Sequence, residues 1–346
     1  MPSSTASPAN TAPPHRTPWQ RLQQLRRHPA GPWLASGLGA VFALFIVYLL
    51  VQNARSIDWA AVWSACLALP VPALVAGGVL ALASHLVYSS FDLFGRKYTN
   101  TGLSVSRTVA ITLVAYPFAL NIGSILGGAA VRLRLYGRQG IGALQLGQIL
   151  GLSIITNWLG YLLLAGALLW AWTPQLPEAW GLSTSALPWT GVVLFTLPLL
   201  YIAACQRRGG RALQWRDHHF PLPHAPGGAL QVLLSAVNWA LMGGAVWLLC
   251  GQEVPYAAAL AAVLLGAVAG LISRIPAGLG VLETVGVAVL SPYMPQPEAL
   301  AAILAYRLLY FFLPLGLAIM AFGISEILNK NGSSGKQDER QTLSNQ

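Results

Sequence analysis

The sequence predicts an all-α polytopic membrane protein. Of its 346 residues, 55% are hydrophobic and only 9% are charged, and the mean hydropathy is +0.59. Soluble domains carry about 25% charged residues, so this chain has too little charge to cover a water-exposed surface. Its apolar stretches are long and uninterrupted, which excludes the alternating pattern of barrel strands. Helices of roughly 20 residues are therefore the expected spanning elements.

About eight hydrophobic units follow one another inside a transmembrane domain expected over residues 29–328. The tail at 1–28 is basic and rich in Ser, Thr, Ala and Pro, and the tail at 329–346 is polar, so both are expected to be disordered. The first unit is longer than the apolar part of a cleaved signal peptide, so we expect it to remain as a span. The expected spans are 33–52, 72–91, 108–130, 143–172, 186–204, 229–250, 257–290 and 299–326.

The basic residues assign a side to each connection. The chain has 20 Lys and Arg against 10 Asp and Glu, and cytoplasmic loops of membrane proteins hold the excess of positive charge. We therefore expect both termini to lie in the cytoplasm. Simple alternation fails twice, because the unit at 108–130 has arginines on both flanks and the unit at 257–290 has no Lys or Arg on either.

Each of these two units contains a glycine-rich break, at Asn121–Gly128 and at Arg274–Gly280. Two interpretations compete: the positive-inside rule is violated, or the two units are re-entrant and return to the side they left. Such backbone is tolerated at membrane depth only inside protein or beside a wet cavity. With re-entrant units, the halves 29–175 and 176–328 start on opposite sides, which predicts an inverted-topology repeat.

A few charges lie within the apolar units, where each costs about 2.5–3.5 kcal/mol on insertion scales. Arg274 and Glu283 flank the second break, either as an ion pair or as a site in which Arg274 binds a phosphate and Glu283 an amine or proton. The backbone N–H groups of Gly278 and Gly280 could add an anion nest. Arg307 lies roughly 12 Å into the last span, where it either snorkels to water or faces Glu283.

The first break has its own candidate residues. Asn121 begins it, and Arg132 and Arg134 follow it. These arginines are either ordinary cytoplasmic charge or a clamp for a lipid headgroup at the inner mouth of a cavity. Asp92 and Arg96, spaced four apart at the end of the second span, predict an ion pair on a helix surface.

Signatures of enzymes, metals and cofactors are missing. There is no GxSxG, HExxH or Walker A motif, and the three cysteines (Cys66, Cys205 and Cys250) lack the spacing of a metal or redox site. His85 is the one histidine within a unit, which favours a packed hydrogen-bonding side chain over a proton carrier. We expect no catalytic residue, no metal and no cofactor, and we attribute the basic charge to membrane orientation rather than to nucleic-acid binding.

Four segments in a fixed order carry a resemblance. Ser90–Tyr98, Asn121–Tyr136, Ile275–Glu283 and Tyr306–Leu315 resemble the lysylphosphatidylglycerol synthase transmembrane-region family, which includes the flippase half of the multiple peptide resistance factor and stand-alone YbhN-like inner-membrane proteins. The resemblance covers about residues 30–326. It implies a bacterial membrane protein whose partner is a phospholipid. In two-part members this region is thought to move lysyl-phosphatidylglycerol between leaflets, and the synthase domain is expected to be absent here.

We therefore expect an integral inner-membrane protein that translocates or binds a phospholipid. Two alternatives stay open. One is a membrane-embedded lipid-modifying enzyme, for which only Glu283, Asp92 or His85 could supply a catalytic group. The other is a non-catalytic scaffold subunit of a separate lipid-synthesis enzyme.

Overall fold

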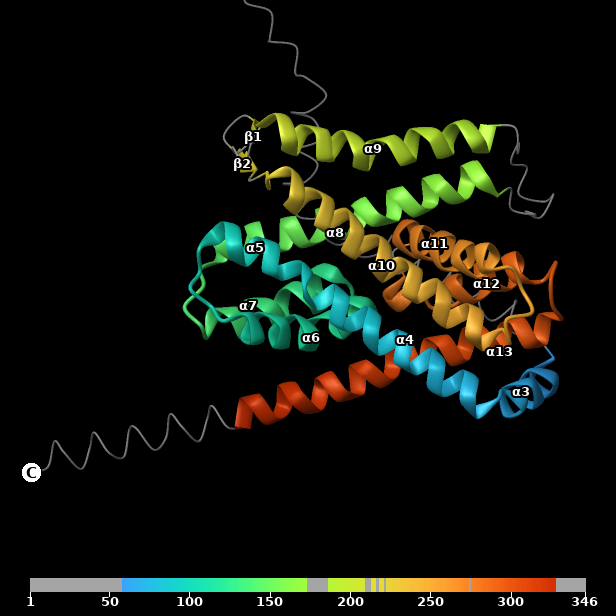
Figure 1. The fold of residues 1–346 in the computed structure, drawn as a ribbon. Helices are drawn as coiled ribbons and strands as arrows, with labels where there is room; N and C mark the ends of the chain where they lie inside the picture. Colours follow the sequence, from blue (N-terminus) through green and yellow to red (C-terminus); the bar gives the residue numbers. More distant parts are fainter. Residues whose placement is uncertain are drawn as a thin grey trace, which may run out of the picture. The chain divides into compact units, whose positions relative to one another are not determined.

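The computed structural model describes most of the predicted transmembrane domain, as helices joined by short connections (Figure 1). Seven of these helices are long and apolar enough to cross a membrane, which confirms the predicted all-α polytopic class. The two tails, the unit at 33–52 and the connection at 173–185 lie outside the described residues. The structure describes residues 58–172, 186–208, 213–215, 218–220, 222–273 and 275–327.

The described chain begins with a short helix that was not predicted, α3 (Trp59–Ala68), whose first turn is capped by the Asp58 carboxylate. Next, α4 (Val71–Ser89) matches the predicted second span. A break of one residue separates it from α5 (Phe91–Thr99), which ends where Asn100 adopts a left-handed conformation. These breaks fix the direction in which the chain enters the first glycine-rich unit.

That unit folds as two helical arms. The first arm, α6 (Val105–Ile122), ends at Gly123, whose φ of 105° is open to glycine but rarely to other residues. A π-helical segment, Ser124–Ala129, follows, and α7 (Ala130–Gly137) forms the return arm. The predicted break therefore lies where the helix reverses.

Contacts between the arms show that the chain turns back on itself. A Cβ at Gly127 would clash with the carbonyl oxygen of Phe118, so the glycine permits the close approach of the two arms. Arg107, near the start of α6, donates through Nη1 to Oε1 of Gln139, just past α7, at 3.2 Å. Both ends of the unit are thus joined directly, as the re-entrant interpretation predicts.

Three long helices form the middle of the chain: α8 (Ala143–Ala171), α9 (Leu187–Arg208) and α10 (Ala225–Leu249). α8 packs against both α9 and α10, and glycines on α8 let the backbones approach closely. Between α9 and α10 the structure describes a pair of short antiparallel strands, β1 (Leu213–Trp215) and β2 (His218–Phe220).

The second glycine-rich unit is also a hairpin. Its arms are α11 (Tyr256–Ser273) and α12 (Val281–Leu290), which pack along one another, and a 3-10 turn at Pro276–Gly278 lies between them. The last element is one helical run that ends at Ile327. It consists of α13 (Gln296–Arg307), a π-helical segment at Leu308–Phe312 and a further helical stretch.

The two hairpins lie at opposite ends of a central helix pair. α4 and α10 run antiparallel, because Gly77 faces Leu249 while Ser84 faces Asn238. Figure 1 shows α6–α7 at one end of this pair and α11–α12 at the other. The tips meet, since α6 contacts the Pro276–Gly278 turn. Each hairpin follows one helix of the central pair and precedes another long helix, which is the arrangement that an inverted-topology repeat predicts.

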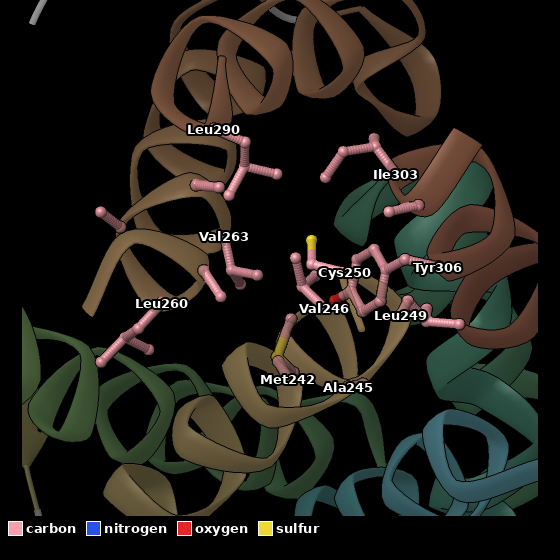
Figure 2. Close-up of a cluster of buried hydrophobic side chains, with 14 of the residues drawn as sticks. Met242, Ala245, Val246, Leu249, Cys250, Leu260, Val263, Leu290, Ile303 and Tyr306 are labelled. Atoms are coloured by element: carbon pink, nitrogen blue, oxygen red, sulfur yellow. The ribbon is translucent and has the colours of Figure 1, made fainter. Parts of the chain in front are cut away.

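The largest apolar cluster fills the space between α10, α11, α12 and α13. Figure 2 shows side chains from all four helices pointing toward one another, with Tyr306 of α13 among them. Within it, Val246, Leu290 and Ile303 are fully buried. This cluster fixes the second hairpin against the central pair and so determines where its turn lies.

Candidate functional site: the junction of the two hairpins

The turn of the second hairpin has a strained backbone. Ala277 has a φ of 57°, and Gly278 and Gly280 have φ values of 58° and 77°. Left-handed conformations suit glycine, whereas at alanine the Cβ crowds the carbonyl oxygen. Such a turn leaves carbonyl groups without helical partners, and these need donors when they are buried.

Arg307 supplies those donors. Its Nη1 donates to the carbonyl of Ala277 at 2.9 Å and its Nη2 to that of Gly278 at 3.1 Å. The same side chain forms an ion pair with Glu283, with Nη2–Oε2 at 2.9 Å and Nε–Oε1 at 2.5 Å. Arg307 is 2% exposed and Glu283 is 16% exposed. Arg307 therefore faces Glu283 rather than snorkelling to water. It stabilises the backbone of the turn as well as the charge of Glu283.

One expectation for this turn changes. The Gly278 N–H donates to the Ile275 carbonyl at 2.9 Å, so it is not free for an anion nest as predicted; the turn offers carbonyls to Arg307 instead. Gly280 is the N-cap of α12, and its carbonyl accepts from the N–H and the hydroxyl of Thr284. The role of its own N–H in an anion nest stays a prediction. Arg274 lies outside the described residues, and its role as a phosphate ligand stays a prediction.

Arg132 lies buried on the return arm of the first hairpin and pairs with Asp92, its Nε at 3.0 Å from Oδ2. The prediction that Asp92 pairs with Arg96 is wrong. Asp92 lies in the first turn of α5 and faces the return arm of the hairpin, where Tyr136 also donates to it, while Arg96 donates to the Leu103 carbonyl. Sequence spacing could not reveal this pairing, because Arg132 comes from a separate helix.

Arg134 lies at an exposed end of the hairpin. It donates through Nε and Nη2 to the two carboxylate oxygens of Glu326, both at 2.7 Å, and Arg138 contacts the same carboxylate. Arg134 is 60% exposed. The structure therefore gives it a protein partner from the last helix, while its predicted role as a headgroup clamp stays a prediction.

Asn121 joins the first hairpin to the last helix. Its Nδ2 donates to the carbonyl of Pro117 at 2.9 Å and to that of Phe311 at 3.1 Å. Two carbonyl acceptors fix the orientation of the amide. Its Oδ1 is buried and has no hydrogen-bond partner in the described part of the chain, so it presents an open acceptor at the hairpin junction.

A buried chain of hydroxyls lies next to this junction and was not predicted as a unit. Ser84 donates to Oδ1 of Asn238 at 2.8 Å and lies 2.9 Å from the hydroxyl of Tyr310, which lies 3.1 Å from that of Tyr116. His85 contacts the rings of both tyrosines. The chain connects α4 and α6 of the first half with α10 and the last helix of the second half.

In the sequence, the signal that could have revealed this hydroxyl chain was the presence of polar residues on otherwise apolar helices. Among the described residues, no group of three His, Cys, Asp or Glu side chains could hold a metal ion, and the three cysteines are free. The site is therefore built from arginine–carboxylate pairs, from turn carbonyls that accept hydrogen bonds from Arg307, and from hydroxyls.

Comparisons with known proteins agree with this architecture. Residues 34–318 match the family model described as the lysylphosphatidylglycerol synthase TM region. The chain is 35% identical to the inner membrane protein YbhN of Escherichia coli over 302 residues, which cover 87% of this chain and 95% of that protein. It is 25% identical to the uncharacterized protein slr0712 of Synechocystis over 332 residues, covering 93% and 100% of the two chains. The chain belongs to the lysylphosphatidylglycerol synthase transmembrane-region family.

Proposed function

We propose that this protein binds a phospholipid headgroup at the hairpin junction and transfers the lipid between the leaflets of a bacterial inner membrane, with both termini in the cytoplasm. The observation that carries the proposal is the buried Arg307–Glu283 pair on the turn of the second hairpin. A charged pair at membrane depth is costly to insert. Two hairpins that enter from opposite ends and meet at such a pair favour a polar substrate path over a purely structural bundle.

The ion pair suggests how a headgroup is admitted. The donors of Arg307 are shared among Glu283 and the carbonyls of Ala277 and Gly278, so a phosphate can enter only by displacing one of them. Glu283 is the more exposed member of the pair. A phosphate that replaces it gains the planar fork of the arginine, and the released turn is free to move. Binding and movement are thereby linked at one side chain.

The acyl chains need no polar path. The face of α9 and the end of the last helix carry exposed large apolar side chains, among them Leu200, Ile319 and Ile324. In a membrane these faces lie against lipid tails, so only the headgroup has to pass the junction. Rocking of one half against the other around the α4–α10 pair would switch its access between the two sides.

The proposal is tested by leaflet transfer in proteoliposomes. Phospholipid labelled on an acyl chain is placed in the inner leaflet, and its appearance outside is followed by quenching. We expect transfer by the wild type and a loss of at least about tenfold, or 1.36 kcal/mol, for Glu283→Gln and Arg307→Gln. Arg274→Ala tests the predicted phosphate ligand outside the described residues.

The same assay includes matched control variants and distinguishes the two alternative functions. Glu298→Gln and Arg208→Gln change an exposed carboxylate and an exposed arginine and are expected to leave transfer unchanged. Equal transfer by all variants would contradict the site. A new lipid product in the vesicles would favour a lipid-modifying enzyme. No transfer, together with a stable complex with a lipid-synthesis enzyme on purification, would favour a scaffold subunit.

A further inference from the structure

His85 presents a basic nitrogen in the centre of the helix pack. The side chain is 3% exposed, and its Nδ1 lies 2.9 Å from the Ala81 carbonyl oxygen. A carbonyl only accepts hydrogen bonds, so Nδ1 carries the hydrogen and Nε2 carries a lone pair. Nε2 is buried and has no hydrogen-bond partner in the described part of the chain.

The hydroxyls of Tyr310 and Tyr116 cannot donate a hydrogen bond to this lone pair, because each already donates its single hydrogen to the next group in the hydroxyl chain. Ser84 donates to Asn238, so in its contact with Tyr310 it must accept, and Tyr310 is the donor. Tyr310 must then accept from Tyr116 in turn. Each hydroxyl has a single hydrogen. The chain therefore runs from Tyr116 toward Asn238, and neither tyrosine retains a hydrogen for His85.

The groups around the imidazole suit a transient positive charge. The titratable side chains that face it are tyrosines: Tyr116 from α6 and Tyr310 from the last helix, with ring centroids at 5.1 and 4.6 Å. Tyr88, one turn along α4, stacks on Tyr116. From α10, Asn238 lies at this level and does not titrate. Aromatic faces within about 6 Å attract a cation.

The nearest full charges are already paired. Asp92 and Arg132 neutralise each other beyond Tyr88, and Glu283 pairs with Arg307, which lies one turn before Tyr310. A proton on His85 would therefore create the one unpaired positive charge in the described part of this junction, on a ring that contacts Tyr310, which lies one turn beyond the arginine proposed to meet the headgroup phosphate.

We propose that Nε2 of His85 binds a proton that crosses the membrane together with the phospholipid; this inference rests on the proposed function. A proton from water on the acidic side adds to the lone pair of Nε2, and the resulting N–H donates to a phosphate oxygen of the headgroup. On the other side the phosphate leaves and the proton returns to water, and no other bond forms or breaks. Because the two ligands occupy the junction together, each strengthens the binding of the other by the same factor.

Cotransport predicts the leaflet in which the labelled lipid accumulates. Protons move from the acidic to the alkaline side, so labelled lipid accumulates in the leaflet that faces the alkaline side. With one proton per lipid, a gradient of one pH unit corresponds to 1.36 kcal/mol, or a leaflet ratio of up to about tenfold. Glutamine at position 85 cannot take up a proton, so this ratio is expected to fall to about one.

The first experiment measures that ratio in vesicles of phosphatidylethanolamine and phosphatidylglycerol, with acyl-labelled phosphatidylglycerol as the probe and a gradient of one pH unit. Wild type, His85→Gln and the exposed control His224→Gln are compared. Accumulation on the alkaline side by wild type and His224→Gln, but not by His85→Gln, supports the proposal. Transfer by the wild type that ignores the gradient, or a gradient response in His85→Gln equal to that of the wild type, overturns it while leaving the proposed function intact.

A second experiment tests the proton site independently of lipid transfer. If neither the wild type nor any variant transfers lipid, that result contradicts the proposed function alone, and this experiment still decides whether His85 binds a proton. Histidine labelled with ¹⁵N is titrated by NMR in nanodiscs containing phosphatidylglycerol. The His85 signals are assigned with His85→Gln, or with Tyr116→Phe if that variant fails to fold. We expect the Nδ1–H tautomer at neutral pH and the imidazolium as the pH is lowered. A ring that stays neutral throughout, or that carries its hydrogen on Nε2, overturns the proposal.

Discussion

Removal of the Arg307 side chain should destabilise the second hairpin far more than removal of a surface arginine. Arg307→Met leaves Glu283 without its partner and leaves the carbonyls of Ala277 and Gly278 without donors. Breaking a buried ion pair by removing one member costs about 3–5 kcal/mol. Glu283→Gln should cost less, about 1–3 kcal/mol, because Arg307 keeps its two carbonyl acceptors. The double variant should lose less than the sum, since the two side chains share one interaction.

The free energy of unfolding is measured by tryptophan fluorescence during denaturation in mixed micelles, for the wild type, both single variants and the double variant. Arg134→Gln is the control, because it removes an arginine that is also paired with a glutamate but is 60% exposed, and no measurable change is expected. If Arg307→Met is as stable as Arg134→Gln, or if the two single effects simply add, Arg307 does not hold the turn and the reasoning is refuted.

Three further changes test the packing. Gly160→Ala should destabilise the protein by about 1–3 kcal/mol, because its Cβ would clash with the backbone of Ala236 on α10, whereas the control Gly151→Ala, in open space, should not; equal stabilities would contradict the close α8–α10 contact. Ala277→Gly relieves about 1–2 kcal/mol of strain from the left-handed conformation, while the greater freedom of glycine in the unfolded chain costs about 0.4–1 kcal/mol. Denaturation should therefore show a small stabilisation, and a loss of stability would argue against the positive φ at this residue. Tyr306→Phe removes a buried hydroxyl that has no hydrogen-bond partner among the described residues, so it should raise stability by about 1 kcal/mol. A loss of lipid transfer without a loss of stability would instead assign that hydroxyl to the substrate.

Much of the fold follows from hydrophobic pattern and charge placement. The predicted units at 143–172 and 229–250 agree closely with α8 and α10, because a membrane span needs a long apolar helix whatever its neighbours. The arginines on both flanks of 108–130 left a re-entrant unit as one of two interpretations, and the Arg107–Gln139 contact that joins the ends of the unit favours it. The short helix α3 was not predicted, because its ten residues are apolar but too few to span a membrane.

The site was harder to predict. Arg307 and Glu283 stood out as charges in apolar units, and the expectation that Arg307 faces Glu283 agrees with the ion pair. The partner of Asp92 and the hydroxyl chain through Tyr310 depend on which helices pack together, and local spacing carries no information about that. His85 was expected to be a packed hydrogen-bonding side chain, and its contact with the Ala81 carbonyl agrees with that. The open Nε2 could not be predicted, because it depends on the tautomer that the neighbours impose.

The central claim is that two hairpins enter the membrane from opposite faces and meet, and site-specific labelling tests it most directly. Single cysteines replace exposed neutral residues, so that the charges that orient the chain are kept, in a background without the three native cysteines. The positions are Ser106 and Gln139 at the ends of the first hairpin, and Gln252 and Gln296 at the ends of the second. An impermeant thiol reagent should reach 106 and 139 from the cytoplasmic side alone and 252 and 296 from the opposite side alone. Labelling of 106 and 139 from different sides would contradict the account.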